Sequence, residues 1–209
     1  MPLDLLSRLK NETAACHTRL ENALDLMRDD LRRDDYIALL ERFHGYVAPW
    51  EHAVAACMPA SLAGFFDARR KAPLLADDLA ALTGDARRAA SLPRAAVDED
   101  LPRMRSIADA FGSMYVMEGS TLGGRFIAPH VAARLALAPG EGNTYFDGYG
   151  PRTGSMWNAF RETAVASVPE AGYDDAVRSA IATFDSLHAW LCPEEVDIDC
   201  SRPTPGAAT

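Results

Sequence analysis

The sequence predicts an all-α fold in a single multihelical domain. Apolar residues recur at steps of three and four over several long stretches, which is the period of an amphipathic helix. No stretch of four or more residues alternates apolar and polar between turn signals, as a half-buried strand does. A chain of 209 residues, 48% of them hydrophobic, is long enough to bury one core. We expect this domain to span residues 1–192, followed by a polar tail over residues 193–209 that is predicted to be disordered.

The first half of the chain predicts two long helices. The first covers residues 5–27, with an apolar stripe that includes Leu9 and Leu24. The second covers residues 34–57. Pro49 lies inside it and is expected to kink this helix or divide it in two, because proline lacks the backbone N–H.

The remainder of the chain predicts shorter pieces and then three more long helices. Residues 61–84 are expected to form short helical segments that break at Pro73 and Gly84. The segment 138–153 is rich in Gly and Pro, so it is expected to be a surface connection. The three other predicted helices cover residues 103–137, 154–168 and 174–192.

Composition and charge restrict the class of partner. The formal net charge of −9 argues against nucleic acid, because binding to phosphate needs a dense Lys and Arg surface. No apolar run approaches the ~20 residues that cross a bilayer, and the first residues lack the order of a secretory signal. We therefore expect a cytoplasmic protein that does not enter a membrane. The four cysteines contain no C-x-x-C pair, so neither a zinc cluster nor a disulfide framework is indicated.

His17 is the first candidate functional residue. It shares a helix face with Leu9, Thr13, Leu20 and Leu24, because offsets of three, four, seven and eight residues bring side chains together. The pattern therefore predicts an inward-pointing histidine. Such a residue is either a hydrogen-bonded core histidine or a ligand, and the rest of the chain has to decide between them.

A glycine-rich run within the predicted helix 103–137 is the second candidate. Gly119, Gly123 and Gly124 fall within six residues, and together they cost a helix about 3 kcal/mol relative to alanine. One interpretation is a helix end or a close helix crossing. The other is a flat ligand lying against bare backbone at a flexible kink. No strand precedes the run, so a phosphate-binding loop is not indicated.

Two basic residues suggest an anionic ligand. Lys10 lies seven positions before His17, two turns along the same face and about 10 Å away by the helical rise. Arg161 follows two aromatic residues on a later predicted helix and can bind a carboxylate in a two-pronged fork. The alternative for either residue is a solvated surface charge.

Two segments resemble motifs of one known family. Residues 9–21, LKNETAACHTRLE, resemble the proximal helix of heme oxygenases, in which a histidine binds the heme iron. Residues 119–124, GSTLGG, resemble their distal helix, and the longer run YVMEGSTLGG is similar to the bacterial heme oxygenases associated with bacteriophytochromes. The resemblance covers about residues 5–190. It implies a fold that holds heme between a proximal helix and a kinked distal helix.

The resemblance implies a role for each candidate in the two helices. His17 corresponds to the proximal iron ligand, and the backbone of Gly119, Gly123 and Gly124 corresponds to the distal wall against the heme. Ser120 stands where many members carry an aspartate that orders the water used for proton delivery. A hydroxyl donates and accepts hydrogen bonds but cannot hold a carboxylate's charge. We therefore assign Gly119 and Ser120 to the catalytic region. Either a water chain or another group takes over the function of the aspartate, or the activity is weak. The resemblance to the bacteriophytochrome-associated enzymes favours the first of these alternatives.

The resemblance also implies contacts at the edge of the heme. Lys10 and Arg161 match family positions that contact the propionates. The family's propionate-contacting tyrosine aligns with Met114, so the neighbouring Tyr115 is assigned only to the pocket.

The resemblance implies a reaction in which heme is both cofactor and substrate. O₂ and electrons open the ring to biliverdin, CO and ferrous iron. The electrons come from an external donor such as a ferredoxin, a flavodoxin or a reductase, and a bacteriophytochrome is the implied recipient of biliverdin.

Two other functions remain open on the sequence. The missing distal aspartate is compatible with a non-catalytic heme or bilin carrier. A non-heme di-iron oxidase of the same fold is the other alternative, because two carboxylate–histidine pairs have the required i, i+3 spacing. The residues that this alternative uses are Glu41-x-x-His44, Asp185-x-x-His188, and Glu12 and Glu118 as further carboxylates.

Overall fold

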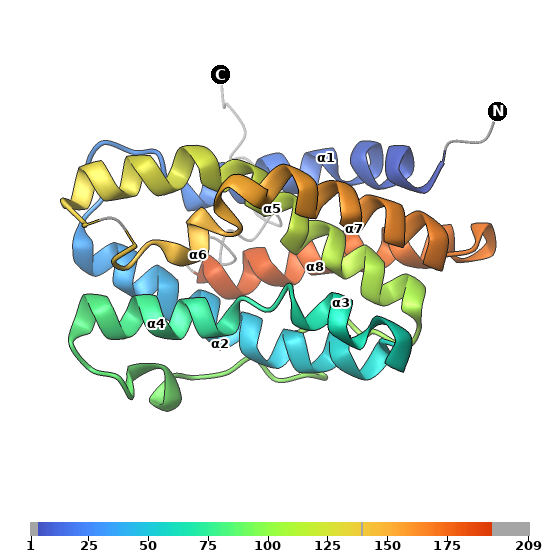
Figure 1. The fold of residues 1–209 in the computed structure, drawn as a ribbon, viewed down its shortest axis with the longest axis horizontal. Coiled ribbons are helices and arrows are strands. Elements are labelled where there is room, and N and C mark those ends of the chain that lie inside the picture. Colours follow the sequence, from blue (N-terminus) through green and yellow to red (C-terminus); the bar gives the residue numbers. More distant parts are fainter. Residues whose placement is uncertain (1–3, 139, 194–209) are drawn as a thin grey trace, which may run out of the picture.

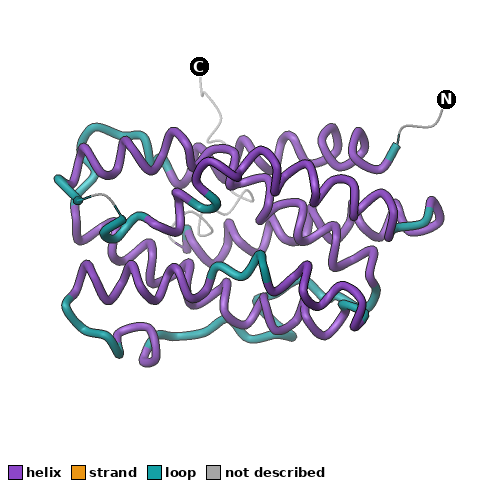
Figure 2. Tube along the Cα trace, viewed as in Figure 1, coloured by secondary structure: helices purple, strands orange, loops and turns teal. Residues whose placement is uncertain are grey.

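The computed structural model describes residues 4–138 and 140–193, and these form a helical protein without a strand (Figure 2). The predicted all-α class is therefore confirmed. The predicted tail 193–209 lies, apart from Pro193, outside the described residues. The α-helices are α1 (Leu5–Leu24), α2 (Arg33–Cys57), α3 (Ala63–Asp67), α4 (Ala72–Thr83), α5 (Ile107–Leu135), α6 (Thr144–Asp147), α7 (Thr153–Ser167) and α8 (Tyr173–Leu191). Short 3₁₀ turns are η1 (Ala60–Leu62), η2 (Arg88–Ser91), η3 (Gly150–Arg152) and η4 (Glu170–Gly172).

The long helix α5 packs against four other helices. It contacts α8 most extensively and also touches α2, α6 and α7, while α1 packs mainly on α8. Figure 1 shows α1 and α7 near one long edge of the molecule and α3 and α4 near the other, with α8 between them. The core that these helices enclose includes the fully buried side chains of Tyr36, Tyr46, Phe66, Phe111 and Phe160.

Helix ends depart from the predicted boundaries where a cap decides them. Asp4 accepts a hydrogen bond from the Ser7 N–H at 2.8 Å and starts α1. Asp25 adopts a left-handed conformation with φ of 36° and ends α1 before residue 27. The Ser106 side chain caps α5, so this helix begins at residue 107 and not at 103.

Pro49 does not divide α2, because another segment replaces the hydrogen bond that proline removes. Its missing N–H would have bonded to the carbonyl of Gly45. The Ala95 N–H donates to that carbonyl at 3.0 Å. Gly45 permits this approach, since a Cβ there would lie 2.5 Å from the Pro93 oxygen.

Pro73 and Gly84 mark the two ends of one helix. Pro73 lies in the first turn of α4, where its missing N–H costs nothing, and Gly84 ends the helix with φ of 72°. The predicted break at Pro73 is thus a helix start.

The segment 138–153 is more than a surface connection. It contains α6, in which Tyr145 and Phe146 are buried. The Asp78 carboxylate on α4 fixes this turn by accepting the backbone N–H of Thr144 at 2.9 Å and that of Tyr145 at 2.8 Å. The Gly- and Pro-rich composition gave no sign of this tertiary contact.

The glycine run does not interrupt α5, although Figure 1 shows the helix changing direction near its middle. A Cβ on Gly124 would lie 1.9 Å from the Phe146 carbonyl oxygen. Gly124 therefore permits a close approach of α6. At Gly119 and Gly123 the nearest atoms to such a Cβ are 3.9 Å and 3.8 Å away. The close-approach interpretation thus applies to Gly124, and the flat-ligand interpretation of Gly119 and Gly123 stays a prediction.

Alanine substitution should separate these two kinds of glycine. We expect Gly124→Ala to lower the free energy of unfolding by about 1–3 kcal/mol, because backbone has to move to admit the methyl group. Gly123→Ala should be neutral or stabilise by up to about 1 kcal/mol, since it adds helix propensity and its methyl group would meet Ile127 only at an ordinary contact distance of 3.8 Å. Urea unfolding of the heme-free variants measures both values. Equal losses at the two positions would contradict the assignment.

Candidate functional site

A pocket of about 690 Å³ lies between α1 and α5. The His17 side of α1 and the loop that follows it form one wall, and residues 116–127 of α5 contribute the opposite wall. Aromatic residues of α2 and α6 line its interior, and Phe184 and Leu187 of α8 complete it. The lining is mainly apolar, which suits a large flat organic ligand.

His17 faces this pocket and not the packed core. Half of its side chain is exposed, and its Nδ1 lies 3.2 Å from a carboxylate oxygen of Glu21, one turn along α1. Its ring meets Phe184 edge-on, with the centroids 5.9 Å apart. A carboxylate at one ring nitrogen fixes the orientation of a histidine and leaves the other nitrogen, Nε2, as a metal ligand.

Gly119, Ser120 and Gly123 line the opposite wall. Ser120 is exposed, and its hydroxyl donates to the Met117 carbonyl at 2.9 Å within the same helix. Its single proton is therefore engaged, and its lone pairs are left to accept hydrogen bonds. Gly124 is absent from the pocket lining and faces the Phe146 backbone, so its assignment to the distal wall stays a prediction.

Lys10, Tyr115 and Arg161 do not belong to the pocket lining either. Lys10 is exposed on α1, and Arg161 is exposed on α7 beside a separate surface hollow that includes Leu6. Tyr115 packs against Trp157 with ring centroids 5.6 Å apart. Burial raises the pKa of Tyr115, and the nearby Arg161 cation opposes that shift. The structure thus brings Arg161 near Tyr115, while the predicted propionate contacts stay predictions.

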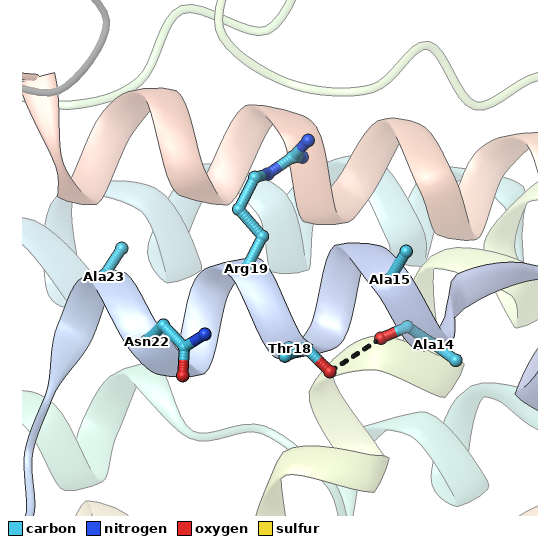
Figure 3. Close-up of a pocket in the computed structure, with 6 residues that line it drawn as sticks. All are labelled: Ala14, Ala15, Thr18, Arg19, Asn22 and Ala23. Atoms are coloured by element: carbon cyan, nitrogen blue, oxygen red, sulfur yellow. Dashed lines mark hydrogen bonds between the residues drawn. The ribbon is translucent and has the colours of Figure 1, made fainter.

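An open hollow of about 740 Å³ lies over another face of α1 (Figure 3). Small side chains line most of it, and the Thr18 hydroxyl donates to the Ala14 carbonyl at 3.1 Å. Arg19 extends toward α8, where it pairs with Asp185. None of the predicted site residues borders this hollow, so the pocket beside His17 is the candidate site.

A buried charged cluster behind α5 was not predicted. Lys71 and Glu118 are 5% and 4% exposed, and the Lys71 Nζ lies 3.2 Å from the Glu118 Oε1. Arg69 and Glu51 are also buried here, and Lys71 lines the pocket. In the sequence, Lys71 ends an Arg-Arg-Lys run that has the composition of a solvated surface, so only the tertiary structure reveals this cluster.

The carboxylates needed for a di-iron centre are bound by cations instead. The described residues contain no group of three or more His, Cys, Asp or Glu side chains placed to hold a metal ion. His44 is buried, with 5% of its surface exposed. The ion pairs are Glu41 with Arg88, Asp185 with Arg19, Glu12 with Arg8, and Glu118 with Arg69 and Lys71.

Burial of His44 predicts a pH dependence of stability. Burial, and then the nearby Arg94 charge, lower the pKa of His44 below its ordinary value of 6.5. The unfolded chain therefore binds a proton more readily, and the stabilisation is present above pH 6.5 and lost as pH falls through the folded-state pKa. Thermal unfolding between pH 8 and about pH 5 should show a steeper loss for the wild type than for His44→Phe. Parallel curves would contradict this assignment.

The described residues define a helical protein with a mainly apolar pocket between two of its helices, α1 and α5. The sequence profile of the heme oxygenase family matches residues 3–192. A heme oxygenase of Xanthomonas campestris pv. campestris (strain 8004) is 30% identical over 164 residues, which cover 77% of this chain and 91% of that protein. The solved structure of heme oxygenase from Leptospira interrogans matches with a TM-score of 0.70 at 17% identity, covering 91% of this chain and 100% of that one.

The chain belongs to the heme oxygenase family, whose members are heme-degrading enzymes. The identification made from the two helix motifs is confirmed, and heme is the molecule that the family implies for the pocket. Neither the di-iron nor the carrier alternative gains support. Among the described residues, no helix is long and apolar enough to cross a membrane.

Proposed function

We propose that this protein uses O₂ and externally supplied electrons to cleave heme to biliverdin, CO and ferrous iron. The observation that carries the proposal is the placement of His17 on one wall of the pocket and of Gly119 to Gly123 on the other. These are the two helix segments that resemble the proximal and distal helices of the family.

The pocket fits a tetrapyrrole on three counts. Its volume of about 690 Å³ lies within the ~300–1,000 Å³ of typical cofactor sites. Gly119 and Gly123 leave the α5 wall without side chains at two positions, so a flat ring can approach the backbone. Glu21 holds the His17 ring by its Nδ1, which suits coordination through the other nitrogen.

His17 is the residue that would hold the heme iron, through the imidazole nitrogen that Glu21 leaves available. When bound, heme supplies both the iron that binds O₂ and the ring carbon that is oxidised. Gly119 admits the ring, and Ser120 accepts a hydrogen bond from a water in the pocket, since its own proton is directed to Met117. Among these residues Ser120 orders water but does not supply a negative charge.

The other proposed contacts lie at or beyond the edge of the pocket. Lys10 and Arg161 are the proposed partners of the propionates, and the packed ring of Tyr115 borders that region. A ferredoxin, a flavodoxin or a reductase is the proposed electron donor, and a bacteriophytochrome is the proposed recipient of biliverdin. We place the reaction in the cytoplasm.

Turnover of the hemin complex tests this function. Aerobic incubation with ascorbate or a reductase system should replace the Soret band by the spectrum of biliverdin and release CO. The reason is that the pocket holds the ring and its iron while donated electrons activate O₂. Binding of hemin without loss of the Soret band would instead identify a carrier.

A histidine substitution tests the ligand. His17→Ala should lose the spectrum of histidine-ligated hemin and bind hemin at least about tenfold more weakly, and added imidazole should restore the ligand band. His52→Ala is the matched control, because His52 lies exposed on α2 with its Nδ1 2.7 Å from the Ala48 carbonyl. A normal histidine-ligated spectrum in His17→Ala would overturn the assignment.

A further inference from the structure

Lys71 brings a buried ammonium group to the heme pocket. It precedes α4, its side chain is 5% exposed, and it is one of the residues that line the pocket. It is the one lysine or arginine in that lining. The protein has only two lysines, Lys10 and Lys71, among its 21 Lys and Arg residues.

The ammonium group of Lys71 is hydrogen-bonded to side chains of Glu118 and Tyr149. Its Nζ donates to the Tyr149 hydroxyl at 2.9 Å and to the Glu118 Oε1 at 3.2 Å. The Tyr149 hydroxyl donates to the same carboxylate oxygen at 2.7 Å, so the three groups form a closed triangle. Glu118 directly precedes Gly119, which ties the triangle to the glycine wall of the pocket.

One N–H of Lys71 has only a weak acceptor within the protein. An ammonium group has three donors. Tyr149 and Glu118 take two of them, and the third contact, to the Arg69 carbonyl, is 3.5 Å long. A stronger acceptor in the pocket can therefore compete for this proton.

The charges around Lys71 act in opposite directions. The pKa of Lys71 is lowered, chiefly by burial, and the carboxylates of Glu118 and Glu51 oppose that shift. Arg69 faces the same cluster and opposes them, with its Nε 3.3 Å from the other Glu118 oxygen. Both buried carboxylates of the cluster have cationic partners, Glu118 with Arg69 and Lys71, and Glu51 with the partly exposed Arg70, so Lys71 has a carboxylate partner as an ammonium ion.

Among its other lining residues, the pocket has no lysine or arginine that could donate a hydrogen bond. His17 and Glu21 belong to the α1 wall, and the Ser120 proton is directed into its own helix. Tyr145 is buried, and burial raises the pKa of its phenol, so it brings no charge. Lys71 is therefore the one lysine or arginine that lines the pocket and can donate a hydrogen bond there.

We propose that Lys71 is the distal cationic hydrogen-bond donor of this pocket, directed toward O₂ and positioned by Glu118 and Tyr149. This inference rests on the proposed function. It identifies the group that offsets the replacement of the distal aspartate by Ser120, and it makes Glu118 and Tyr149 positioning residues.

The stretching frequency of CO bound to the reduced hemin complex tests the proposal. A cationic donor beside CO lowers this frequency, so Lys71→Met should shift the infrared band to higher wavenumber. Tyr149→Phe should broaden the CO band or shift it less than Lys71→Met does, because the ammonium group still has Glu118 as a hydrogen-bond partner. Arg87→Met is the control, since Arg87 is exposed and belongs neither to the pocket lining nor to the ion pairs of the cluster, and its band should stay unchanged. An unchanged band in Lys71→Met would overturn the proposal.

Lys71→Met alone leaves Glu118 with one cation fewer and can destabilise the fold. The double variant Lys71→Met/Glu118→Gln controls for this effect, because it removes one charge of each sign from the cluster. It should bind hemin within a few-fold of wild-type affinity, show the same shift of the CO band, and degrade heme about 10²-fold more slowly. A wild-type CO band and rate in this folded variant would reject the donor role.

A second readout needs neither iron nor turnover. In protein labelled with ¹³C at the lysine ε carbon, two lysine side chains give signals, and Lys10→Arg assigns them. Binding of diamagnetic zinc protoporphyrin should shift the Lys71 signal. Binding that leaves this signal unchanged would overturn the proposal and leave the proposed function intact. Failure of any porphyrin to bind would instead contradict the proposed function itself.

Discussion

Bare backbone on α5 is the constraint on which the rest of the structure depends. A Cβ on Gly112 would lie 2.0 Å from the Ala176 oxygen of α8, and one on Gly124 would lie 1.9 Å from the Phe146 oxygen. Contacts this close require glycine, and they fix α5 against α8 and α6. Between them, Gly119 and Gly123 have no side chain, and a Cβ there would meet only side-chain atoms at 3.9 Å and 3.8 Å. The same helix therefore has glycines that its packing requires and glycines that leave its pocket wall without side chains.

The two walls of the pocket differ in how they hold their polar groups. On α1, the His17–Glu21 pair lies within a single helix turn and half exposed, so local geometry alone produces it. Behind α5, the buried charges come from separate parts of the chain: Glu51 from α2, Lys71 before α4, and Glu118 from α5. Burial makes unpaired charges costly, so these groups have to be satisfied together. The arrangement places a cation beside the pocket in a protein of net charge −9.

The fold class and the two helices that form the pocket could be predicted from the sequence. The helical period and the motifs around His17 and Gly119 are local features, and local features can be recognised without knowledge of long-range contacts. The same reasoning fails where a distant segment decides the outcome. Pro49 stays within α2 because Ala95 supplies the missing hydrogen bond, and residues 144–147 form a helix because Asp78 binds their first N–H groups.

Only the tertiary structure decided which predicted residues share the pocket. It separated Gly124 from Gly119 and Gly123, left Lys10 and Arg161 outside the lining, and brought in Lys71 from a run of surface composition. The physical reason is that the role of a residue in a site depends on what packs against it, and packing joins positions that are far apart in the chain. Sequence period and motif identify the helices that carry a site, but they do not specify which atoms meet across it.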